Sequence, residues 1–175
     1  KKEMENLYKA IQAEEKKILA QANNYKAQIE KNKKLLDDID KEIQKIIDSK
    51  SNNNGQYGGG TMFWPVPTVK NISSGYGWRW GKLHKGIDIA NGSVAVYGQK
   101  VVAAADGVVI YSNSTNSWGG GYGYYIMIDH GTDSKGRRIV TLYAHNSRVY
   151  AKVGDKVVGG RTVISLAGDT GNVTG

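Results

Sequence analysis

Residues 100–112 read KVVAAADGVVIYS, in which two β-branched runs, Lys100–Ala104 and Val108–Ser112, flank a turn that contains Gly107. From Pro67 onward the same pattern recurs, because short β-branched or aromatic runs alternate with glycine-bearing turns. The other candidate strands are Gly86–Ala90, Tyr124–His130, Arg138–His145 and Thr162–Ala167. Many short strands at close spacing predict an all-β domain, either a barrel or a sandwich.

The first fifty residues have the opposite composition, with no glycine or proline and 22 charged side chains. Apolar residues from Met4 to Ile46 are separated by threes, fours and sevens, with Lys and Glu between them, which is heptad spacing. Such a narrow stripe needs a partner in water. The pattern predicts a long α-helix of the coiled-coil type that self-associates or binds another helix through residues 4–47. The alternative is a dedicated regulatory or docking helix.

These two compositions divide the chain into three parts. Residues 1–50 are predicted to form the coiled-coil helix, residues 51–61 a flexible linker rich in Asn and Gly, and residues 62–175 the β domain. The net charge of +8 suits polyanionic surroundings such as an anionic cell wall. No nucleic-acid motif is present, so nucleic acid is not an expected partner.

The remaining composition agrees with an exported protein. The chain has no cysteine and no apolar run near the roughly 18 residues that span a bilayer. It begins with lysine, so we expect that a signal peptide preceded this sequence. The expected location is therefore extracellular, at the cell wall.

The stretch LHKGIDIA (residues 83–90) holds the candidate metal ligands, His84 and Asp88. On a strand, an even spacing puts both side chains on one face, and Gly86, Ile87 and Ile89 favour a strand here. Nitrogen and carboxylate ligands suit zinc, and a catalytic zinc needs three protein ligands. The motif supplies two of them. The alternative is a surface histidine beside a structural aspartate.

His145 ends the run VTLYAH (residues 140–145), where a strand is expected to pass into a polar loop. A histidine there is well placed for acid–base work, although a hydrogen-bonded loop residue is the alternative. His130 precedes a turn and is expected to be structural. No Gly-x-Ser-x-Gly elbow and no phosphate-binding glycine loop are present. Four aromatic residues could contact substrate: Tyr76, Trp78, Trp80 and Trp118. Aromatic residues of a β domain are more often part of the core, so core packing is expected for them.

Seven stretches of residues 64–175 together resemble the catalytic domain of the LytM/lysostaphin-type zinc endopeptidases of peptidoglycan, peptidase family M23. They are SGYGWR (74–79), HKGIDIA (84–90), VVAAADGVVIYS (101–112), YGYYIMIDHG (122–131), VTLYAH (140–145), VGDKVVGGRTVI (153–164) and AGDTGNVTG (167–175). The resemblance implies a small, mostly antiparallel β fold with an open groove for a cross-linking peptide of peptidoglycan. It also implies that His84 and Asp88 bind Zn²⁺ and that His145 is a catalytic histidine.

One feature of the family is missing from this sequence. In the family, the run Thr-Gly-Asn-x-Thr-Gly is followed by a His-x-His pair that supplies the third zinc ligand and another catalytic histidine. This sequence ends at Gly175, immediately before that position. Three explanations stay open: a longer native chain, a second polypeptide that supplies the missing strand, or a non-catalytic relative that binds the cell wall or regulates an amidase. A protein that ends at Gly175 is expected to have little or no hydrolytic activity.

Overall fold

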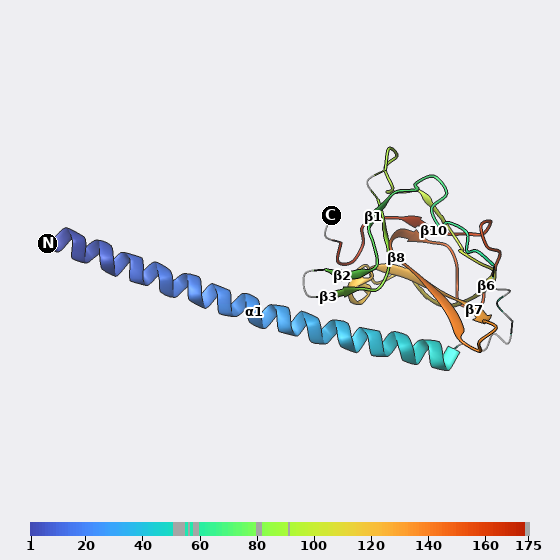
Figure 1. Ribbon diagram of the computed structural model, residues 1–175, viewed down its shortest axis with the longest axis horizontal. Helices are drawn as coiled ribbons and strands as arrows, with labels where there is room; N and C mark the ends of the chain where they lie inside the picture. Colours follow the sequence, from blue (N-terminus) through green and yellow to red (C-terminus); the bar gives the residue numbers. More distant parts are fainter. Residues whose placement is uncertain (51–54, 56, 58–59, 80–81, 91, 174–175) are drawn as a thin grey trace. The chain divides into compact units, whose positions relative to one another are not determined.

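The structure is a computed structural model that describes residues 1–175 except 51–54, 56, 58–59, 80–81, 91 and 174–175. For Asn32, Leu36 and Lys82 it describes the backbone alone. The chain forms two compact units, Lys1–Glu42 and Ile43–Gly175. The division falls within helix α1 (Lys2–Lys50), so the last two turns of the helix belong to the β-rich unit (Figure 1). Most of the predicted linker 51–61 lies outside the described residues.

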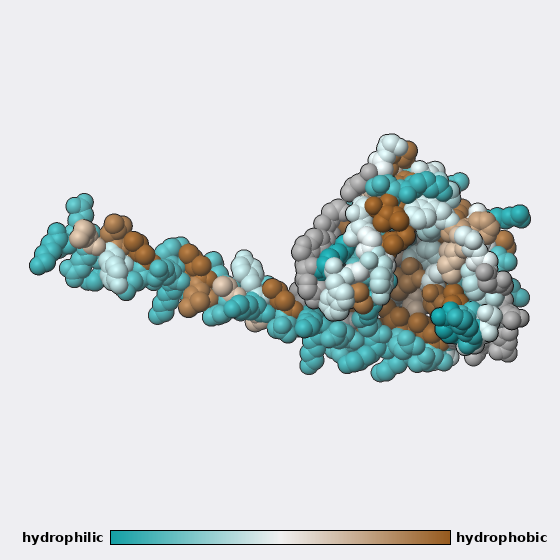
Figure 2. Space-filling view, in the orientation of Figure 1, coloured by the Kyte–Doolittle hydropathy of each residue, from teal (hydrophilic) through white to brown (hydrophobic). Residues whose placement is uncertain are grey.

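The first unit is the helical segment that the heptad spacing predicts. Its apolar residues are exposed in the single chain, including Met4, Leu7, Ile11, Ile18, Tyr25 and Ile29. Figure 2 shows brown apolar patches along the helix, separated by hydrophilic residues. Exposed ion pairs such as Lys9–Glu5 add only a few tenths of a kcal/mol each. Within the described part of the chain, no helix is long and apolar enough to cross a membrane.

The second unit is an antiparallel β half-barrel, and a long helix followed by an all-β domain is therefore confirmed. The strands are β1 (Ile72–Ser74), β2 (Gly77–Arg79), β3 (Lys82–His84), β4 (Asp88–Ile89), β5 (Lys100–Val102), β6 (Gly107–Asn113), β7 (Tyr124–Thr132), β8 (Arg138–Val149), β9 (Lys156–Val157) and β10 (Val163–Ala167). The main sheet has the strand order β5-β10-β8-β7-β6-β9. Two small antiparallel sheets, β1-β4 and β2-β3, complete the unit.

Apolar side chains are buried on both faces of the main sheet, and the residues of β7 contribute to both. Ile126 and Ile128 lie in the main core, whereas the alternate residues Tyr125 and Met127 lie in a second cluster. Because successive side chains point to opposite faces of a strand, this division places one cluster on each face. A strand buried on both faces is continuously apolar, which explains the unbroken run YYIMI (residues 124–128).

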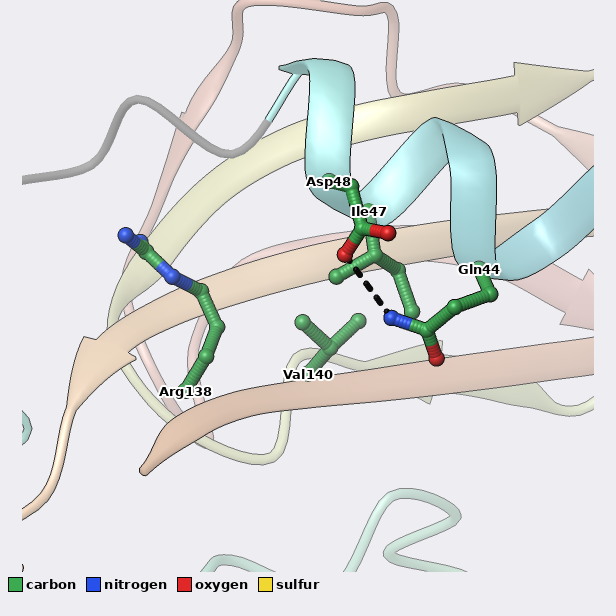
Figure 3. A pocket seen from close by; sticks show the side chains of 5 residues that line it. All are labelled: Gln44, Ile47, Asp48, Arg138 and Val140. Atoms are coloured by element: carbon green, nitrogen blue, oxygen red, sulfur yellow. Dashed lines mark hydrogen bonds between the residues drawn. The ribbon is translucent and has the colours of Figure 1, made fainter. Parts of the chain in front are cut away.

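The C-terminal end of α1 covers the second cluster. Ile43 and Ile47 pack against a group formed by Ile110, Tyr125 and Met127, to which β8 also contributes apolar side chains. Figure 3 shows the edge of this contact, where a pocket is lined by Gln44, Ile47 and Asp48 of α1 and by Arg138 and Val140 of β8. The sheet face therefore depends on residues 43–47, which the composition assigns to the coiled coil.

Local details differ from the sequence-based expectations. The strand predicted over Gly86–Ala90 is present only as β4. The expectation that one strand carries both His84 and Asp88 is wrong, because β3 ends at His84, β4 begins at Asp88, and residues 85–87 lie outside both strands. In the predicted linker, Gly55 and Tyr57 each form a backbone hydrogen bond with Thr132, at the end of β7. These two described residues therefore pair with the end of β7.

Candidate metal centre

His84 and Asp88 lie together although they belong to different strands. The Nε2 atom of His84 is 3.3 Å from Oδ1 of Asp88. The side chain of His84 is 17% exposed and that of Asp88 is 42% exposed, so both groups reach solvent. The two residues come together because residues 85–87 form a short turn between strands of two small sheets, rather than by facing outward from one strand.

The tautomer of His84 is defined by its other ring nitrogen. Nδ1 lies 2.8 Å from the carbonyl oxygen of Gly75. Because a carbonyl only accepts hydrogen bonds, Nδ1 carries the hydrogen and donates it. Nε2 is then the atom that faces Asp88. A backbone carbonyl on the far nitrogen is the usual outer partner of a metal-binding histidine.

The separation of the two facing atoms fits zinc. Ligand distances of about 2.0–2.2 Å and tetrahedral angles place two zinc ligands roughly 3.3–3.5 Å apart. The observed 3.3 Å lies in this range. It is longer than a charge-assisted N–H···O bond, which is typically about 2.7–2.9 Å. In the described part of the chain, no group of three or more His, Asp, Glu or Cys residues gathers around a possible metal position.

The other oxygen of Asp88 has a different partner. Oδ2 accepts a hydrogen bond from a guanidinium nitrogen of Arg79 at 3.1 Å, and the same nitrogen donates to the hydroxyl of Ser74. Ser74 lies opposite Asp88 in the β1–β4 pair, and the hydroxyl of Ser73 donates to the main-chain carbonyl of Asp88 at 3.2 Å. The carboxylate is therefore held at one oxygen and faces His84 with the other.

His145 lies at an irregular position of β8. Tyr124 of β7 pairs with Asn146 and Ile126 pairs with Tyr143, so Ala144 and His145 together oppose the single residue Tyr125. This is a β-bulge, a feature that often redirects a side chain beside an active site. His145 has φ +57°, the one positive φ among the described non-glycine residues. Such backbone conformations are costly and concentrate at functional sites.

Two carbonyl groups hold His145 in this conformation. Its backbone N–H donates to the carbonyl of Tyr122 at 2.8 Å. Its Nδ1 donates to the carbonyl of Thr170, also at 2.8 Å, so Nε2 is again the free ring nitrogen. No contact among the described residues joins His145 to His84 or Asp88. The structure thus brings the first two predicted residues together, and His145 has the same tautomer as His84.

The segment around Thr170 is itself firmly attached to the sheet. The hydroxyl of Thr170 donates to the carbonyl of Asn146 at 2.7 Å and accepts from the backbone N–H of Tyr124 at 2.9 Å. Thr170 also packs directly on Gly123, whose φ is +65° and where a Cβ atom would clash with it. The backbone N–H of Asn172 donates to the carbonyl of Gly121 in the 3₁₀ turn Gly119–Gly121.

His130 agrees with the structural role that the sequence indicated. It is 3% exposed, Nδ1 donates to the carbonyl of Asp106 at 2.7 Å, and Nε2 lies 2.8 Å from the hydroxyl oxygen of Thr141. Burial lowers the pKa of His130, and the Asp106 hydrogen bond opposes this shift only in part. Both ring nitrogens are engaged, so His130 has no free atom for catalysis.

The aromatic residues expected in the core are on the surface. Tyr76 is 68% exposed, Trp78 78% and Trp118 50%, while Trp80 lies outside the described residues. Tyr76 and Trp78 flank Gly77 and follow Gly75, whose carbonyl orients His84. The expectation of core packing is wrong for these three side chains. Tyr76 and Trp78 lie beside and in β2, which belongs to a small two-stranded sheet outside the main sheet, and Trp118 lies in the loop that leads into the 3₁₀ turn Gly119–Gly121.

The comparisons with known proteins identify the family. The family model described as peptidase family M23 matches residues 82–175. The chain therefore belongs to peptidase family M23, the LytM-type zinc metallopeptidases. No curated protein sequence matches the chain.

Two solved structures support this assignment. A zinc-containing peptidase from Vibrio cholerae shares 28% identity with a TM-score of 0.52, over 66% of this chain and 34% of that protein. This chain thus spans about a third of the length of the Vibrio protein. A mutant catalytic domain of the prophage-encoded M23 protein EnpA from Enterococcus faecalis shares 30% identity, also with a TM-score of 0.52, over 67% of this chain and 82% of that domain.

Several groups that shape the site were not singled out from the sequence. Arg79 donates hydrogen bonds to both Asp88 and Ser74, and Arg79 and Ser74 occur in the matched stretch SGYGWR. The carbonyl groups of Gly75 and Thr170 orient the two exposed histidines. A backbone carbonyl is common to every residue type, so only the presence of these positions in matched stretches could have indicated them.

Proposed function

We propose that the protein is a zinc-dependent endopeptidase that hydrolyses peptide cross-links of bacterial peptidoglycan and acts outside the cell, at the wall. The observation that carries the proposal is the 3.3 Å separation of His84 Nε2 and Asp88 Oδ1, with His84 Nδ1 occupied by Gly75. Family membership supports the substrate class. The excess of basic residues favours an anionic polymer as the surroundings of the substrate.

In this proposal each residue has one role. His84 and Asp88 hold the metal through Nε2 and Oδ1. When bound, zinc supplies a Lewis acid that polarises the scissile carbonyl and makes water nucleophilic near neutral pH. His145 presents Nε2 to the reacting groups, where it exchanges a proton with the attacking water or the leaving amine. We propose that a third ligand comes from the His-x-His pair that in the family follows the position of Gly175.

The exposed stripe of the first unit supports the coiled-coil part of the proposal. Apolar residues such as Met4, Ile18 and Tyr25 are between 58% and 75% exposed in the single chain. A second helix would cover them, and sedimentation of the protein over a range of concentrations tests for self-association.

The decisive experiment measures zinc content and cleavage together. Full-length protein is expected to bind about one zinc per chain and to release new amino groups from purified peptidoglycan. His84→Ala and Asp88→Asn are expected to lose both properties. Asp37→Asn, which changes an exposed carboxylate of the helix in the same way, serves as the matched control. Binding to peptidoglycan with neither zinc nor cleavage would instead identify a non-catalytic wall-binding protein.

A further inference from the structure

The two oxygens of Asp88 are unequal. Oδ1 faces His84 at 3.3 Å, whereas Oδ2 is bonded to Arg79 at 3.1 Å. Arg79 also donates a hydrogen bond to the hydroxyl of Ser74. The backbone of Ser74 lies opposite that of Asp88 in the β1–β4 pair. The guanidinium of Arg79 thus bridges Ser74 and Asp88 and occupies Oδ2, while Oδ1 is the oxygen directed at His84.

We infer that Arg79 is a positioning residue for the metal site, which its guanidinium prepares by fixing Asp88 as a one-oxygen ligand directed at His84. Ser74 has a supporting role because it holds the guanidinium. This inference rests on the proposed zinc site. The stretch 74–79 then orients both ligands, since it also contains Gly75, whose carbonyl fixes the tautomer of His84.

Charge and orientation make opposite predictions for Arg79. A positive charge beside a cation repels it, so a purely electrostatic effect would make zinc bind more tightly once Arg79 is removed. Loss of orientation would make zinc bind more weakly, because the carboxylate would then be free to rotate. The Arg79 side chain is 32% exposed and that of Asp88 is 42% exposed, so solvent screens the repulsion. We therefore expect the orientation effect to dominate.

The experiment measures zinc affinity in the full-length protein by competition with a chromophoric chelator. Arg79→Gln is expected to weaken zinc binding about 10- to 100-fold, the usual range for outer partners of metal ligands. Arg79→Lys keeps the charge but lacks the planar fork, so it is expected to weaken binding as well, by about tenfold. Ser74→Ala is expected to have a smaller effect in the same direction. The visible spectrum of the Co²⁺-substituted protein is expected to change in Arg79→Gln, which a merely structural role would not cause.

Arg137→Gln is the matched control, because it removes an arginine that binds an aspartate, Asp133, at 2.7 Å in an exposed turn. Zinc affinity and the Co²⁺ spectrum are expected to stay unchanged in this variant. Unchanged or tighter zinc binding in folded Arg79→Gln overturns the inference. If Arg79→Gln does not fold, unchanged zinc affinity in Ser74→Ala overturns it. Absence of zinc from the unmodified protein would instead overturn the proposed function.

Discussion

The Nδ1 atom of His145 lies 2.8 Å from the carbonyl oxygen of Thr170. This hydrogen bond connects a bulge in strand β8 with the segment that follows β10, the last strand along the chain. It leaves Nε2 of His145 free and holds the ring at a residue whose backbone is itself strained.

Replacement of His145 by Asn separates the role of the imidazole from that of the backbone. Asn tolerates a positive φ better than most residues, so the bulge is expected to persist. Cleavage of peptidoglycan is expected to fall about 10²- to 10⁴-fold, the usual contribution of general acid–base catalysis. Zinc content is expected to remain that of the unmodified protein, because His145 is not among the proposed ligands. Full activity in this variant would remove His145 from the proposed mechanism.

Replacement of Thr170 by Val tests how the segment after β10 is anchored. The valine has nearly the same shape but loses the hydroxyl that accepts from Tyr124 N–H and donates to the Asn146 carbonyl. An unsatisfied donor of this kind costs about 1–3 kcal/mol, so denaturant unfolding is expected to show that loss of stability. Cleavage is expected to fall as well, because the less firmly anchored segment no longer positions the backbone carbonyl of residue 170 against His145. Thr170→Ser keeps the hydroxyl and is the control that should restore both properties.

The longer strands were predictable from the sequence because they carry long apolar runs. The runs around Val108–Ser112, Tyr124–His130 and Arg138–His145 correspond to β6, β7 and β8 with ends shifted by a few residues. Strands β1, β2, β3 and β9 were not predicted, because two or three residues are too few to show alternation. The break between β3 and β4 was missed for a related reason: Ile87 and Ile89 suit a strand although residues 85–87 form a turn.

The candidate site was predictable only in part. The spacing of His84 and Asp88 predicted that the two side chains lie together, and they are 3.3 Å apart, whereas their role as metal ligands stays a prediction. The partners that orient them could not be deduced from spacing, since the Gly75 carbonyl is a backbone group and Arg79 lies nine residues from Asp88. The heptad stripe likewise indicates an apolar face of α1 but not its partner. Ile43 and Ile47 pack on the sheet, whereas the stripe in the first unit is exposed.

Replacement of Ile47 by Ala tests whether the end of α1 is part of the folded β-rich unit. Ile47 packs against the cluster around Ile110, Tyr125 and Met127, so its truncation is expected to lower the stability of the β-rich unit by about 1–3 kcal/mol. Ile18→Ala is the matched control, because Ile18 is 58% exposed on the same helix. It is expected to change stability by less than about 0.5 kcal/mol. Equal unfolding transitions for the two variants would mean that the helix end contributes nothing to the sheet.

His130 predicts a pH dependence of stability that is separate from catalysis. Burial lowers the pKa of His130 in the folded protein below its ordinary value of about 6.5. Between the two pKa values the unfolded chain therefore binds more protons than the folded chain. The stability contributed by neutral His130 is thus fully present above about pH 6.5 and is lost as the pH falls below that value. For one group the slope is at most about 1.4 kcal/mol per pH unit.

The measurement compares denaturant unfolding of the unmodified protein and of His130→Gln, which does not titrate, at pH values from about 7.5 down to about 5. His130→Gln is expected to be less stable at about pH 7.5, because the substitution removes a buried imidazole ring that makes two hydrogen bonds. The difference between the two proteins is expected to narrow on acidification, since only the unmodified protein loses the His130 contribution. All other groups are the same in both proteins, so the difference isolates His130. A gap that stays constant across this range would show that His130 takes up a proton as readily in the folded protein as in the unfolded chain.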